Sequence, residues 1–120
     1  MRAAHAILLT VCLFVMGASL MPDPAEARVA ATSIGGKPGR WCGWWMRTQK
    51  GGGPELNLAR NWAKWGRPSG PRVGAVVVWS HHVGMITGRT ASGWVIKSGN
   101  DGGRVRERVR SVAGAVFRVG

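Results

Sequence analysis

A cysteine, a histidine pair and an asparagine follow one another along this chain as Cys42, His81-His82 and Asn100. A thiol beside an imidazole can act as a nucleophile, and a side-chain carbonyl that accepts the imidazole N–H fixes the ring tautomer. Cys42 falls at the start of an expected helix, where unpaired backbone N–H groups favour the thiolate. The alternative for Cys42 is a small buried hydrophobic residue among the tryptophans.

The choice of base between the two histidines depends on strand alternation. If a strand begins at His82, then His82, Gly84 and Ile86 share one face, and the missing side chain of Gly84 lets a helix end come close. His81 then lies in the turn and faces solvent. A structural role for His82 is the alternative, because a lone histidine on a strand is often structural.

The third residue is expected on the next strand, where Trp94, Ile96, Ser98 and Asn100 alternate onto one face. Asn100 is the candidate that orients the imidazole of His82 through its side-chain carbonyl. Asp101 is an alternative, but alternation points it away. The segment SGNDGG (98–103) also has the composition of a simple turn.

The elements that must position these residues change in character along the chain. Tryptophans at i, i+3 and i+4 predict a first helix over 41–49 that carries Cys42, and a second helix fits 56–65. Residues 67–71 read as a turn-rich connector. Valine-rich and alternating segments then predict about five antiparallel strands in a meander, over 73–79, 82–87, 93–98, 104–110 and 115–119. The expected fold class is therefore α+β, with short N-terminal helices packed on a small sheet.

Residues 1–27 have the pattern of a secretory signal peptide. Arg2 precedes an uncharged apolar run over 6–20, and the small-residue pattern at 25–27 predicts cleavage near Ala27. An uncleaved anchor is the alternative. Residues 28–39 read as a flexible lead-in, and residues 40–120 as the domain. We therefore expect export to the periplasm or the medium, with Cys42 as the only cysteine left after cleavage.

The composition narrows the classes of partner. The formal net charge is +12, and removal of residues 1–27 would raise it to +13. This balance excludes an acidic calcium-binding scaffold and favours an anionic partner. Two cysteines in the whole chain exclude a disulfide-stapled scaffold. Four arginines over 104–110 alternate with valines, which predicts a basic stripe on one strand face.

Four segments resemble motifs of CHAP-type (cysteine, histidine-dependent amidohydrolase/peptidase) domains, which belong with the NlpC-like, papain-fold peptidoglycan hydrolases. They are WCGWW (41–45) followed by ARNWAKWG (59–66), VGAVVVW (73–79), HVGMITG (82–88) and WVIKSGN (94–100). The likeness covers about residues 40–119. It implies a papain-like core, with Cys42 as the nucleophile, His82 as the general base and Asn100 as the orienting residue.

The resemblance also implies a reaction and its partners. The expected activity is hydrolysis of amide bonds in peptidoglycan by an amidase or endopeptidase, without a metal or another cofactor. Peptidoglycan or its fragments are the expected partners, an anionic envelope surface is a further one, nucleic acid is not expected, and the domain is expected to be a monomer.

Some positions depart from the family pattern and keep a second function open. Ala75 replaces the family's aspartate after the strand glycine, and KGGG (50–53) shortens the first helix. No Gln or Tyr precedes Cys42 as a side-chain oxyanion donor, which leaves the backbone N–H of Cys42 with the Trp41 indole or Arg40. The alternative function is a catalytically weak or inactive cationic module that binds cell-wall polymer or another anionic partner.

Overall fold

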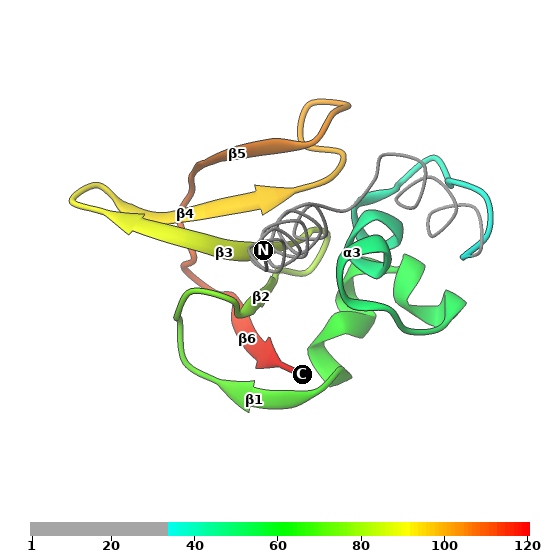
Figure 1. The fold of residues 1–120 in the computed structure, drawn as a ribbon, viewed down its shortest axis with the longest axis horizontal. Helices are drawn as coiled ribbons and strands as arrows, with labels where there is room; N and C mark the ends of the chain where they lie inside the picture. Colours follow the sequence, from blue (N-terminus) through cyan, green and yellow to red (C-terminus); the bar gives the residue numbers. More distant parts are fainter. Residues whose placement is uncertain (1–33) are drawn as a thin grey trace, which may run out of the picture.

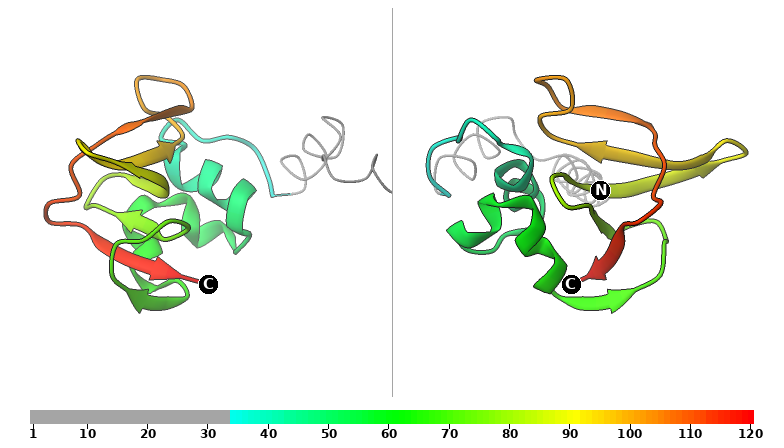
Figure 2. Two further views of the ribbon diagram at one scale, coloured as in Figure 1. Left: turned by 60° about the vertical axis from the view of Figure 1, so that its left-hand side comes forward. Right: turned by 180° about the vertical axis from the view of Figure 1, so that it is seen from behind.

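The computed structural model describes residues 34–120, which form an α+β domain with helices on one face of a single antiparallel sheet (Figure 1 and Figure 2). The expected signal peptide, residues 1–27, and the first part of the lead-in lie outside the described residues. The elements, in chain order, are α3 (Cys42–Lys50), the 3-10 helices η2 (Pro54–Asn57) and η3 (Ala59–Lys64), β1 (Arg67–Ser69), β2 (Val76–Val78), β3 (Val83–Thr90), β4 (Gly93–Ser98), β5 (Arg106–Val109) and β6 (Val116–Val119).

The sheet has six strands in the order β1-β6-β2-β3-β4-β5, so the expectation of five strands in a simple meander is wrong. Strands β2 to β5 do form a meander, but β6 returns to lie between β1 and β2. The additional strand is β1, in the segment read as a connector. Pro68 is compatible with a strand at this position, because β1 lies at the edge of the sheet. A proline has no backbone N–H to donate, and edge strands tolerate this loss.

Helix α3 occupies almost the predicted range, but the face that it buries overlaps the predicted stripe only at Trp45. The sequence predicts a stripe of Trp41, Trp44, Trp45 and Thr48, of which all but Trp45 are only half-buried. The side chains that enter the core are Cys42, Trp45 and Met46, spaced i, i+3 and i+4. The position of the thiol on the buried face follows from this rotation of the helix.

The prediction of a single helix over 56–65 is wrong, because the chain forms two short 3-10 helices in this region. Leu58 interrupts them with extended backbone angles and is 45% exposed. Trp62 is fully buried and its indole N–H donates to the carbonyl of Leu56 across 2.7 Å, which ties η3 to η2. Gly66 follows η3 with a φ of 60°, as expected of a helix stop.

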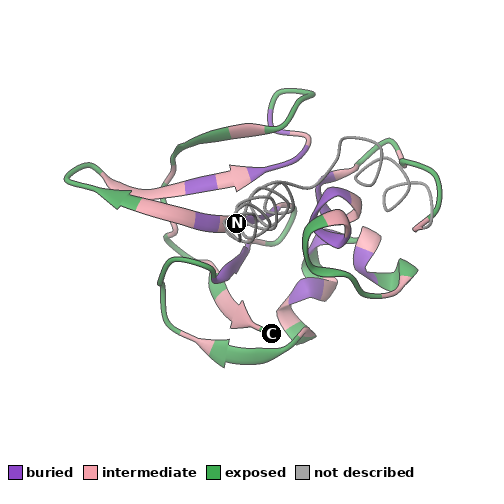
Figure 3. Cartoon of the chain, viewed as in Figure 1, coloured by how far each residue is buried: buried purple, intermediate pink, exposed green. Residues whose placement is uncertain are grey.

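Two hydrophobic clusters lie on opposite sides of the sheet. The buried positions, purple in Figure 3, lie on the helices and on β2, β3 and β4. Alternation along β2 divides them: Val76 and Val78 join the cluster that the helices cover, and Val77 joins the other. The second cluster consists of Ala75, Val77, Ile86 and Ile96. Within residues 34–120, every helix is too short or too polar to span a bilayer.

Candidate active site

Cys42 is the first residue of α3 and is 5% exposed. Trp41 precedes it as the N-cap residue, and the carbonyl of Trp41 accepts the N–H of Trp45 across 2.8 Å. No side chain caps the helix start, so backbone N–H groups there remain available to a bound group. The thiol is free, as it is not part of a disulfide.

Two glycines let the surrounding backbone approach the start of α3. A Cβ on Gly43 would collide with the carbonyl oxygens of Leu56 and Asn57, so η2 packs directly on the helix next to Cys42. A Cβ on Gly99 would lie 2.5 Å from Cβ of Trp45 and 2.9 Å from the ring of Trp41. The end of β4 and the start of α3 therefore pack closely, and this contact brings Cys42 near the turn that follows β4.

His82 lies in the turn just before β3, which begins at Val83. Its carbonyl accepts the N–H of Trp79 across 2.9 Å, and its ring packs 5.8 Å from the ring of Trp79. His82 is half-buried, whereas His81 is exposed. The expected contrast between the two histidines is therefore present, although the turn holds both of them.

The imidazole of His82 is held by Ser98, and not by Asn100, among the described residues. Nε2 of His82 lies 2.8 Å from Oγ of Ser98, which is 1% exposed at the end of β4. A Cβ on Gly84 would lie 3.0 Å from Cβ of Ser98. The missing side chain of Gly84 therefore makes room for β4, and not for the helix as expected. Strand alternation had placed Ser98 on the His82 face, so this signal was available in the sequence.

Asn100 lies beyond the end of β4, so the strand alternation used to predict its position does not apply to it. Strand β4 ends at Ser98, and Asn100 has a φ of 52°, in the left-handed region. Asn100 nevertheless lines the cavity that contains Cys42 and His82. Asn100 is thus close to the candidate pair, without the expected hydrogen bond to the ring.

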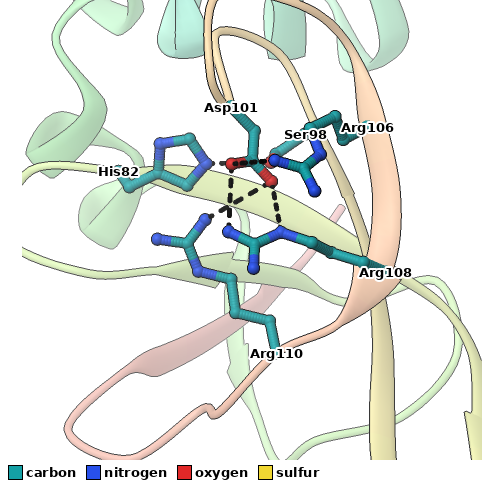
Figure 4. A network of polar contacts seen from close by, with 6 residues as sticks. All are labelled: His82, Ser98, Asp101, Arg106, Arg108 and Arg110. Carbon is teal, nitrogen blue, oxygen red and sulfur yellow. Dashed lines mark hydrogen bonds and ion pairs between the residues drawn. The ribbon is translucent and has the colours of Figure 1, made fainter.

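Asp101 was expected to point away, but it is buried under three arginines beside His82 and Ser98 (Figure 4). Arg108 donates to both carboxylate oxygens, across 2.7 Å from Nε and 3.0 Å from the terminal nitrogen. Arg106 and Arg110 contribute ion pairs at 4.0 and 3.9 Å. The predicted basic stripe is therefore an arginine cluster around one carboxylate, and Arg104 lies outside it.

The surroundings of His82 lower the pKa of its imidazole to about 4. Burial is the main cause, because it disfavours the charged ring, and the positive charges of Arg110 and Arg108 act in the same direction. The carboxylate of Asp101 opposes them. His82 is therefore neutral at pH 7, so it can accept a proton.

Two cavities meet at Cys42. The smaller, of about 420 Å³, is lined by all three predicted site residues together with two others: Arg40, Cys42, His81, His82 and Asn100. The larger, of about 560 Å³, contains Cys42, Arg40 and His81 as well, and extends along η2 and η3 past Glu55, Leu58 and Arg60. The nucleophile candidate thus lies at the junction of two spaces that can each hold part of a substrate.

Comparison with known proteins adds no assignment: no family model, curated protein or solved structure matches this chain. Among residues 34–120, no group of three or more His, Cys, Asp or Glu side chains is placed to hold a metal ion. The chemistry of the site is therefore argued from its own residues.

Proposed function

We propose that this protein is an exported cysteine hydrolase with a papain-like core that cleaves amide bonds in peptidoglycan. One observation carries the proposal: Cys42, at the start of a helix, shares a cavity with a neutral His82 whose Nε2 is held by Ser98. A nucleophile, a general base and a residue that orients the base are the minimum for acyl transfer. The resemblance of the four sequence motifs to CHAP-type domains supports the same reaction.

The first half of the reaction forms a thioester. Nε2 of His82 lies within hydrogen-bond distance of Oγ of Ser98. In the proposal, His82 reacts as the tautomer that carries its proton on Nε2 and donates it to Oγ of Ser98, which leaves Nδ1 free. Nδ1 takes the proton of the Cys42 thiol while sulfur attacks the amide carbon. The tetrahedral intermediate then collapses, the C–N bond breaks, and His82 returns the proton to the leaving amine.

The second half releases the acid. His82 removes a proton from water, the hydroxide attacks the thioester carbon, and the C–S bond breaks as Cys42 recovers its proton from His82. The negative oxygen formed in both halves needs donors that are already in place. The backbone N–H of Cys42 and the side-chain amide of Asn100, which line the same cavity, take this role in the proposal.

The second candidate function is a cationic module that binds an anionic polymer without turnover. It is favoured by the low exposure of Cys42, 5%, and by the excess of arginine over acidic residues around the site. The same residues serve both functions, so geometry alone does not separate them. Cys42 does, because only hydrolysis needs its sulfur.

The experiment is incubation of the purified protein with peptidoglycan and mass analysis of the soluble products. New fragments that carry one added water, absent with Cys42→Ala, support the hydrolase. Cys42→Ala keeps every basic residue, so sedimentation with peptidoglycan should be unchanged. Binding by both proteins with product from neither would favour the cationic module.

A further inference from the structure

The two cavities that meet at Cys42 differ in charge. The larger contains Glu55 opposite Arg40 and Arg60, so its charges are partly balanced. The smaller contains Arg40 and no acidic residue. Only three acidic residues lie in 34–120, namely Glu55, Asp101 and Glu107, so few of them are available to neutralise it.

A second positive charge, that of Arg110, lies near His82 but outside the lining of the smaller cavity. The guanidinium of Arg110 lies 4.8 Å from the Trp79 ring centre, and that ring packs 5.8 Å from His82. The nearest carboxylate, Asp101, is already bound at both oxygens by Arg108. Arg110 contacts it only at 3.9 Å, so its charge is incompletely neutralised. The side of the site next to His82 is therefore cationic.

The proposed reaction assigns one half of the substrate to each cavity. His82 must deliver a proton to the leaving amine, so the leaving half of the substrate has to lie within its reach. His82 and Asn100 line the smaller cavity only. The larger cavity, which also contains Cys42, is left for the acyl half.

We infer that the smaller cavity receives the amine half of the substrate and that this half carries a carboxylate, which Arg40 binds in the cavity lining and the nearby charge of Arg110 attracts. The inference rests on the proposed function for the assignment of sides, and on the arginines for the charge. It names the substrate class: amides whose leaving group is an amino acid or short peptide with a negative charge near the cleaved bond.

The charge is tested without turnover, by alkylation of Cys42 with iodoacetate and with iodoacetamide at pH 7. The iodoacetate rate divided by the iodoacetamide rate should be at least about threefold higher for Cys42 than for N-acetylcysteine, because the negatively charged iodoacetate is attracted to the cavity. Arg40→Gln and Arg110→Gln should each lower the ratio. Arg89→Gln is the matched control, since it removes the same charge on the β3–β4 hairpin, where Arg89 stacks on Trp94.

An alkylation ratio equal to that of N-acetylcysteine would overturn the anion site. So would an equal decrease in all three variants, because it would reflect net charge only.

The assignment of the substrate halves to the two cavities is tested with paired synthetic stem peptides that end in a carboxylate or a carboxamide on the amine side. The carboxamide should raise KM about tenfold, and Arg40→Gln should remove the difference.

Equal turnover of the paired peptides would contradict the leaving-group assignment. Turnover of neither peptide, nor of any peptidoglycan fragment, would contradict the hydrolase itself and the assignment of sides with it. A raised iodoacetate ratio in that case would still support the anion site. The failure of the proposed function and the failure of the charge argument are thus distinguishable.

Discussion

Nε2 of His82 lies 2.8 Å from Oγ of Ser98, so the residue that orients the imidazole comes from within β4 and not from the turn after it. A buried hydroxyl can accept the ring N–H as a carboxamide oxygen would. In the proposed mechanism Ser98 is therefore a positioning residue, and Asn100 is left to contact the substrate.

Replacement of Ser98 by Ala should lower kcat by about ten- to hundredfold, because an unanchored ring leaves its productive orientation. KM should change little, since Ser98 does not line either cavity. Steady-state kinetics of peptidoglycan-fragment hydrolysis would measure both. Ser92→Ala, which removes an exposed hydroxyl in the turn between β3 and β4, is the control and should retain kcat. An unchanged kcat in Ser98→Ala would remove Ser98 from the site.

The pH dependence of turnover should have its acid limb near pH 4. His82 must be neutral to take the thiol proton, and its pKa is lowered to about 4 from the ordinary 6.5, so turnover falls only below that value. Arg110→Gln removes a positive charge that disfavours the protonated ring, and should move the limb to higher pH. A limb near 6.5 in the unmodified protein would be inconsistent with a buried, neutral base.

The same lowered pKa makes the folded state less stable in acid. Between about pH 6.5 and 4 the unfolded chain binds a proton at His82 that the folded protein does not. The free energy of unfolding should therefore decrease as pH falls through this window, and this contribution should be level above it. Urea unfolding at several pH values would show the slope. His82→Gln should flatten it.

Gly99→Ala should reduce both stability and turnover. The new Cβ would press on Trp45 and Trp41, with a cost of about 1–3 kcal/mol, and would push the start of α3 away from β4. Gly70→Ala is the control, because nothing lies within 4 Å of a Cβ there. Chemical unfolding and activity of the two variants provide the comparison. Equal stability of the two would mean that the contact at Gly99 is not tight.

The sequence was sufficient to predict the fold class and the positions of α3 and β4, because apolar spacing and valine-rich segments depend on local chemistry. It did not predict that β1 pairs with β6. That pairing joins Arg67 to Val119, so it depends on where a distant segment returns. The broken helix at Leu58 was missed for a similar reason, since the contact of η2 with Gly43 overrides helical spacing.

The candidate site was predictable in its residue types and less so in its connections. Cys42, His82 and Asn100 do line one cavity, but the prediction extended strand alternation two residues beyond the end of β4. The turn there gives Asn100 a left-handed backbone and buries Asp101. Where a strand ends is decided by tertiary contacts, and here the contact is the packing of Gly99 against α3.

The position of β6 also bears on how the sheet is completed during folding. Strand β6, the last described strand in chain order, lies between β1 and β2, and the pairing of β1 within the described sheet is with β6 alone. Until residues 116–119 pair, β1 and β2 have no common neighbour, and the sheet stays incomplete. Closure of the sheet is therefore a long-range event that brings residues 67–69 and 116–119 together across the intervening strands.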